Sequence, residues 1–147
     1  MSQQSASIII ARSPDDVFAY MDDTAREHEW QPNLKSAEQD PAGPTRVGTR
    51  KSYTNQFMGR DVENTYVVTL LEPGRRVVYE TAKGSAVDAR SEILCEAAVD
   101  GTKVTMSITG TPKGVLRFVP SALLEIAYRE ELNAALSRLK KQMESGG

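Results

Sequence analysis

The hydrophobic pattern divides the chain into three parts, and the first part predicts a strand followed by two short helices. An apolar run at 7–11 is typical of a short strand. The next helix is predicted to have Ser13 as its cap and Pro14 at its first position. A second helical stretch is predicted over 24–30, ahead of Pro32, because a proline disfavours helical geometry in the residue before it.

The second part begins at Val47, where apolar and polar residues start to alternate with a period of two. Turn dipeptides interrupt the alternation at Met58-Gly59, Pro73-Gly74, Lys83-Gly84 and Asp100-Gly101. The apolar sets expected on one face are Val62, Tyr66, Val68 and Leu70, then Val87, Ala89, Ile93, Cys95, Ala97 and Val99, then Val104, Met106 and Ile108. Val67 and Leu71 blur the first set. This pattern predicts antiparallel hairpins with one wet face and one dry face.

The third part is helical. It follows the turn-like GTPKG at 110–114, whose spacing does not match a phosphate-binding loop. Pro120 either kinks this helix or starts its main part, and the segment 121–143 would span about 34 Å. The dry sheet face and the apolar stripe of the helix are expected to cover each other, which predicts an α+β fold.

This order of elements resembles the START-like helix-grip superfamily, which includes pollen-allergen-like proteins and the polyketide cyclase/dehydrase group. The resemblance covers essentially the whole chain. It rests on IIIARSPDDVFAYMDD at 8–23, WQP at 30–32, VGT at 47–49, MGRDVENTYVVTLLEPGRRVVYET at 58–81, DGTKVTMSITG at 100–110 and LSRLKKQME at 136–144. It implies a curved antiparallel sheet of about seven strands wrapped around a long C-terminal helix. It also implies two short helices between strands 1 and 2, and an internal, mostly apolar cavity.

Length and composition limit the number of domains, the location and the partners that are expected. The 147 residues fit one domain over 1–147, and Cys95 is the only cysteine, which excludes an internal disulfide and favours a reducing, cytoplasmic location. A secretory signal and an apolar run of membrane-spanning length are both missing, so no membrane insertion is expected. The net charge of -2 without long charged runs predicts no nucleic-acid partner.

The only histidine and the only tryptophan lie together in EHEWQPNL at 27–34. His28 lacks a second histidine, a cysteine or a suitably spaced carboxylate pair, so we interpret it as a solvated residue rather than a catalyst or a metal ligand. Trp30 is expected to close one end of the core, where the short helices lead into the second strand. Neither a metal site nor a cofactor is predicted.

Glu131 is the best functional candidate. A helical projection places it inside the apolar stripe of the last helix, between Ala127 and Ala135 and beside Tyr128. A lone buried carboxylate is costly, so it should have a partner, a raised pKa or access to a wet cavity. One alternative is a salt bridge to Lys51 or Arg50, or a helix rotated toward solvent. The other is a cavity-lining anchor that orients a ligand or transfers a proton.

The implied cavity predicts the class of function, which depends on a ligand held in the interior. Small alanines at 127, 134 and 135 would leave space between helix and sheet. The residues expected to contact a ligand are Glu131, Tyr128, Tyr66, Asn64, Tyr53, Phe57, Tyr79, Ser91, Met106 and Trp30. Asn64 and Ser91 are equally able to bond to neighbouring backbone.

Three functions remain open at this point. The first is binding of a small hydrophobic or aromatic molecule, lipid-, quinone- or polyketide-like. The second is an enzyme of the polyketide cyclase, aromatase or dehydratase type that uses the same cavity. The third is a partner-binding module whose interior is filled by side chains. Few inward polar groups favour the binding function, and the pattern does not predict the ligand or the oligomeric state.

Overall fold

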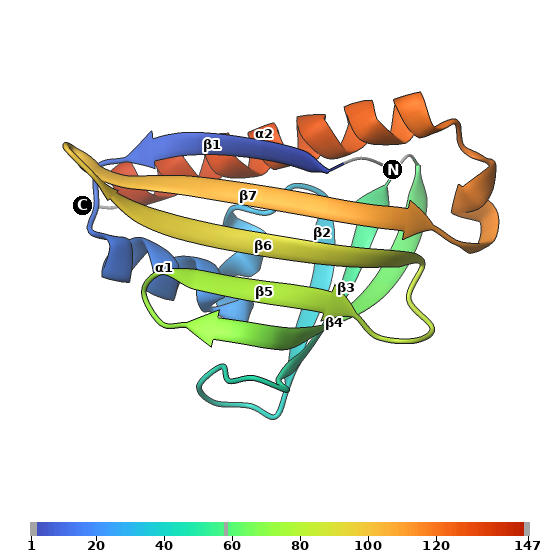
Figure 1. Cartoon of the computed structure of the whole chain (residues 1–147), viewed down its shortest axis with the longest axis horizontal. Coiled ribbons are helices and arrows are strands. Elements are labelled where there is room, and N and C mark those ends of the chain that lie inside the picture. Colours follow the sequence, from blue (N-terminus) through green and yellow to red (C-terminus); the bar gives the residue numbers. More distant parts are fainter. Residues whose placement is uncertain (1–2, 58, 146–147) are drawn as a thin grey trace.

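Seven strands form one antiparallel sheet in the computed structural model, which describes residues 3–57 and 59–145 (Figure 1). The strand order is β1-β7-β6-β5-β4-β3-β2. The strands are β1 (Gln4–Ile10), β2 (Leu34–Asp40), β3 (Arg50–Phe57), β4 (Arg60–Glu72), β5 (Arg76–Thr81), β6 (Val87–Ala98) and β7 (Gly101–Pro112). The helices are α1 (Pro14–Asp22), η1 (Thr24–Glu29), η2 (Gly114–Phe118) and α2 (Ser121–Ser145), where η marks a 3₁₀-helix. The predicted α+β helix-grip architecture is confirmed.

Local capping explains where the helices begin. The Ser13 side chain accepts a hydrogen bond from the Asp16 amide at 3.2 Å and caps α1, as predicted. Asp23 caps η1 in the same way by accepting from the Ala25 amide at 3.1 Å. Pro120 lies directly before α2, and its carbonyl accepts from the Leu124 amide at 3.1 Å. Pro120 therefore starts the long helix and does not kink it.

The predicted hairpin turns are present where the structure describes them. Gly59, Gly74, Gly84 and Gly101 all have positive φ. At Gly101 an added Cβ would lie 2.1 Å from the carbonyl oxygen of Ile10, so this turn requires glycine for space as well as for conformation. Met58, the other half of the first turn dipeptide, lies outside the described residues.

The alternation in β4 changes phase at Thr69. Val68 pairs with Tyr79 and Leu70 pairs with Val78, so Thr69 is an extra residue in the ladder. A bulge of this kind shifts the following side chains to the opposite face. Leu71 consequently packs against the core, and the prediction that placed Leu70 there is wrong.

Two further predictions fail at strand ends. Val47 is 61% exposed in the loop before β3, so alternation begins at Arg50 and not at Val47. Val99 is fully exposed in the turn after β6, and Ala97 is exposed at the end of that strand. At Val47 the pattern starts before the chain enters the sheet, and at Val99 it continues after the chain has left it.

Helix α2 runs beside β1 at one edge of the sheet, while β2 and β3 lie on the far side of the curve (Figure 1). Arg129 Nε donates to Gln4 Oε1 at 3.3 Å, and Lys140 Nζ donates to the carbonyl oxygen of Ile9 at 2.7 Å. These bonds attach α2 to both ends of β1. No helix among the described residues is long and apolar enough to cross a membrane.

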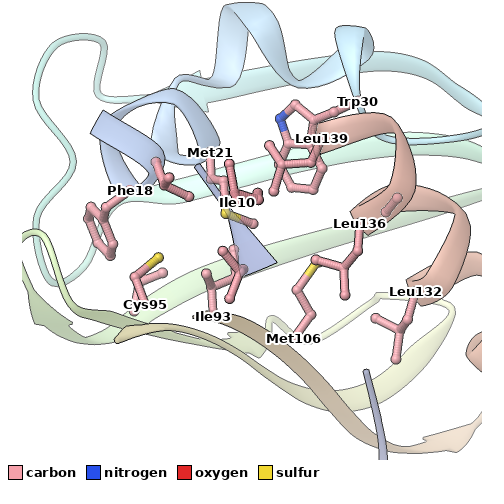
Figure 2. Close-up of a cluster of buried hydrophobic side chains, with 14 of the residues drawn as sticks. Ile10, Phe18, Met21, Trp30, Ile93, Cys95, Met106, Leu132, Leu136 and Leu139 are labelled. Carbon is pink, nitrogen blue, oxygen red and sulfur yellow. The ribbon is translucent and has the colours of Figure 1, made fainter. Parts of the chain in front are cut away.

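Two separate hydrophobic clusters hold the two halves of α2. The Trp30 cluster contains Ile10, Val17, Phe18, Met21, Trp30, Val68, Val77, Tyr79, Ile93, Cys95, Val104, Met106, Leu132, Ala135, Leu136 and Leu139. The Phe57 cluster contains Phe57, Val62, Val87, Ala89 and Leu124. Figure 2 shows the first of these, with Leu132, Leu136 and Leu139 of α2 among side chains from the sheet and from α1.

Trp30 is a core residue and His28 is exposed, as predicted. We expect Trp30→Ala to lower the free energy of unfolding by about 3–5 kcal/mol, because it opens a large cavity in the Trp30 cluster. His28→Ala should change it by less than about 0.5 kcal/mol. Urea unfolding followed by circular dichroism measures both. A similar loss in the two variants would contradict the structural role assigned to Trp30.

Candidate functional site

A cavity of about 140 Å³ lies between α2 and the concave face of the sheet. Its walls come from both core clusters and from every strand of β2–β7, together with α1, η1 and α2. The lining residues are Met21, Glu27, Gln31, Leu34, Tyr53, Asn55, Phe57, Val62, Asn64, Tyr66, Tyr79, Ser91, Ile93, Met106, Ile108, Tyr128, Glu131, Leu132 and Ala135. An engineered cavity of about 150 Å³ in another protein holds benzene, so this space is large enough for an aromatic ring.

The structure brings together nine of the ten predicted contact residues around this space. They are Glu131, Tyr128, Tyr66, Asn64, Tyr53, Phe57, Tyr79, Ser91 and Met106. Trp30 is fully buried in its own cluster and does not line the cavity, because its ring packs among the aliphatic side chains there. Of the three small alanines, Ala135 lines the cavity, Ala127 packs against the Phe57 cluster, and Ala134 points to solvent.

Asn64 already has structural partners. Its side-chain oxygen accepts hydrogen bonds from the backbone amides of Ala86 at 2.9 Å and Val87 at 3.3 Å. The side chain therefore holds the start of β6 against β4, the backbone-bonding alternative considered for this residue.

Aromatic rings form much of the wall. Tyr66 lies edge-on to Tyr53, with centroids 6.0 Å apart, and to Tyr79, with centroids 6.3 Å apart. Phe57 stacks on Tyr128 at 5.0 Å. Burial raises the pKa of Tyr128 to about 12 and raises that of Tyr66 further, so both hydroxyls stay protonated at neutral pH. The walls thus present ring surfaces and neutral hydroxyl groups.

Glu131 reaches the cavity from the middle of α2. Among the described residues it has no hydrogen-bonded or ion-paired partner, and the suggested salt bridge to Lys51 or Arg50 is wrong. Burial raises the pKa of Glu131 from 4.5 to about 7, because water hydrates the carboxylate poorly there. Of the outcomes expected for this residue, a raised pKa within a cavity is the one found.

Lys51 is instead the centre of a second polar group, which the sequence analysis missed. Its ammonium is fully buried, donates to the Asp22 carbonyl oxygen at 2.8 Å and lies 3.3 Å from Asp22 Oδ1. It lies 3.9 Å from Glu27 Oε1 and 5.7 Å from the centroid of the Tyr79 ring. Glu27 Oε1 also accepts from the Tyr53 hydroxyl at 2.8 Å. These contacts satisfy Lys51 and orient the Glu27 carboxyl at the cavity wall.

Burial raises the pKa of Glu27 to about 7, and the nearby Lys51 charge opposes that rise.

The sequence does contain a signal for the polar group around Lys51. Lys51, Tyr53, Asn55 and Phe57 occupy every second position of β3 and all point inward. Read with period two, Lys51 shares the face of three cavity residues and needs a buried anion.

The lining carries negative but not positive groups. Glu27 and Glu131 are its charged members, and the lining residues that the structure describes include no lysine, arginine or histidine. Within the described ranges no cluster of histidine, cysteine, aspartate and glutamate is placed to hold a metal ion. The arrangement is suited to enclosing an apolar body and to holding or moving a proton at two carboxyl groups.

Comparison with models of known protein families gives a match over almost the whole chain. The model of a family described as polyketide cyclase/dehydrase and lipid transport matches residues 1–144. No curated protein sequence matches the chain.

Solved structures with the same fold cover almost the whole chain. A protein from Thermus thermophilus has a TM-score of 0.84 at 14% identity, with 99% of each chain covered. A START superfamily protein from Mycobacterium smegmatis has a TM-score of 0.81 at 13% identity, again with 99% of each chain covered. An aromatase/cyclase from a Streptomyces species has a TM-score of 0.77 at 14% identity and covers 99% of this chain and 98% of its own. At these identities the likeness establishes the fold alone.

The raised pKa of Glu131 predicts a pH-dependent cost to stability. The folded protein holds this proton more tightly than the unfolded chain, whose glutamate titrates near 4.5, so ionisation destabilises the fold as pH rises from about 5 to 8. Glu131→Gln should therefore raise the free energy of unfolding by about 1–3 kcal/mol at pH 8, less than a full shift implies because the side chain is only half-buried. The gain should vanish near pH 5.

Urea unfolding at the two pH values measures the difference. Glu130→Gln, which removes an exposed charge from the same helix, is the control and should show no such dependence. A gain of equal size at pH 5 and pH 8 would mean that the Glu131 charge is not the cause.

Proposed function

The chain belongs to the polyketide cyclase/dehydrase and lipid transport family, and from this premise we propose that it binds a small hydrophobic or aromatic molecule in the cavity under α2. The observation that carries the proposal is the cavity itself, about 140 Å³ of space among aromatic and aliphatic walls in the middle of the fold. A packed interior has few voids larger than a water molecule, so a space of this size is a feature in its own right. Its chemistry fits a ring system or a short apolar chain.

The ligand classes that fit are lipid-, quinone- and polyketide-like. Phe57, Tyr66, Tyr79 and Tyr128 offer ring surfaces for stacking, and Met106 offers an adaptable apolar contact. Ser91 and the two carboxyl groups provide the few polar contacts that orient a ligand.

A second function is favoured by one observation. Glu27 and Glu131 both have a pKa of about 7, so at neutral pH one can accept a proton while the other donates one. Cyclisation or dehydration of a polyketide-like chain needs those two steps. Incubation of the protein with a linear poly-β-ketone, followed by chromatography and mass spectrometry, tests this alternative. Conversion above the buffer rate that is lost in Glu131→Gln would establish an enzyme, and conversion equal to buffer would leave binding alone.

Filling the cavity provides the direct test of binding. Ala135 is 1% exposed and lines the cavity, whereas its neighbour Ala134 faces solvent. We expect indole, a neutral aromatic probe small enough for a space of about 140 Å³, to bind the wild type with saturation. Ala135→Leu should weaken that binding at least about tenfold, because the added side chain occupies the ligand space. Ala134→Leu should bind like the wild type.

Calorimetric titration measures these affinities, and circular dichroism confirms that the variants are folded. Native mass spectrometry of the protein from its own source would then identify a co-purifying ligand. Equal indole binding in both leucine variants would place the probe outside the cavity and contradict the proposal.

A further inference from the structure

The charge of the cavity is unevenly compensated, and this unevenness points to a class of ligand. The inference rests on the proposed binding function. At one wall the Glu27 carboxyl has Lys51 at 3.9 Å and the Tyr53 hydroxyl at 2.8 Å. At the other wall Glu131 has no partner among the described residues. A carboxylate in such surroundings is stabilised by a positive charge that the protein does not supply.

Aromatic rings surround the uncompensated group. Tyr128 lies beside Glu131 on α2, Tyr66 is close enough for the two groups to interact electrostatically, and Phe57 stacks on Tyr128 at 5.0 Å. The face of an aromatic ring carries partial negative charge and attracts cations, most strongly where water is excluded. Rings and carboxylate therefore favour the same kind of guest.

We propose that the cavity selects ligands that combine an apolar or aromatic body with one positively charged amine, and that Glu131 is the counter-ion of that amine. The ammonium group lies against Glu131 and the rings of Tyr66 and Tyr128, while the apolar body occupies the space toward Ile93, Met106 and Leu132. Ligands with a carboxylate or phosphate group are excluded, because the described lining offers them two acidic groups and no base.

Glu27 does not serve as the counter-ion. Its charge is balanced by Lys51, which is itself anchored by the carbonyl oxygen and carboxylate of Asp22. An amine placed there would compete with a fully buried ammonium already in place. The asymmetry between the two carboxyl groups gives the ligand one orientation in the cavity.

Three probes of nearly equal shape separate charge from apolar contact. 2-Phenylethylamine is cationic, 2-phenylethanol is neutral and 3-phenylpropanoate is anionic at pH 8. Calorimetric titration of the full chain should give an affinity at least about tenfold higher for the amine than for the alcohol, with the propanoate weakest. Glu131→Gln should remove the advantage of the amine over the alcohol. Glu130→Gln, which removes an exposed charge from the same helix, should keep it.

The pH dependence of ligand affinity provides an independent test. Amine binding requires the ionised carboxylate, so its affinity should rise from pH 6 to pH 8 in the wild type, while an alkyl amine with a pKa of about 10 stays charged. A neutral ligand that accepts a hydrogen bond from protonated Glu131 would show the opposite trend. The other titratable groups facing this space are Glu27, Tyr53, Tyr66, Tyr79 and Tyr128, and comparison with Glu131→Gln isolates the share of Glu131.

The outcomes distinguish the two proposals. If indole binds and the amine is no better than the alcohol, or keeps its advantage in Glu131→Gln, the amine selectivity is wrong and the binding function stands. If neither indole nor any of the three probes binds, the proposed function itself is wrong.

Discussion

The cavity depends on how α2 is held, since its two halves are fixed in different hydrophobic clusters. Leu124 packs with Phe57 near the start of the helix, and Leu136 and Leu139 pack in the Trp30 cluster toward its end. A rigid helix anchored at both ends cannot bend into the curved sheet between them. The middle of α2 therefore lies over the cavity, whose opposite wall is formed by side chains of the facing strands.

The position of α2 also determines which of its side chains face the cavity. The middle of α2 contributes Tyr128, Glu131, Leu132 and Ala135 to the cavity. Ala135 leaves space where a larger side chain would restore close packing, and Glu131 brings a carboxyl group whose burial lowers stability. Both choices cost stability in a fold that gains most of its stability from burial of apolar surface. Departures of this kind from good packing are typical of functional sites.

Two carboxyl groups of equal chemistry acquire different roles from their surroundings. Glu27 is oriented by Tyr53 and balanced by Lys51, so it belongs to a network that also ties η1 and α1 to β3. Glu131 is held only by its own helix. The first group is bound to the framework and the second is free to interact with a guest, and this difference underlies the proposed polarity of the site.

Much of this protein follows from its sequence alone, because secondary structure and core faces depend on local periodicity. The cap at Ser13, the glycine turns and the long helix after Pro120 are encoded within a few residues each, and the helical projection alone was enough to single out Glu131. The order of these elements predicts an α+β fold, and its resemblance to the START-like superfamily implies the helix-grip arrangement. Local patterns do not show where a strand ends, as the exposed Val99 illustrates. A strand ends where its hydrogen-bonded pairing with the neighbouring strand ends, and this depends on both strands.

Only the tertiary structure decided which polar groups meet. Asp22, Glu27 and Lys51 are up to 29 residues apart in sequence and belong to three different elements, yet both carboxylates lie within 4 Å of the Lys51 ammonium. Trp30 lies between them in sequence and still packs away from the cavity. The physical reason is that the energy of a buried charge depends on the distance to its counter-charge and on the water it loses. Both are properties of how distant segments pack, and neither is contained in the pattern of any one segment.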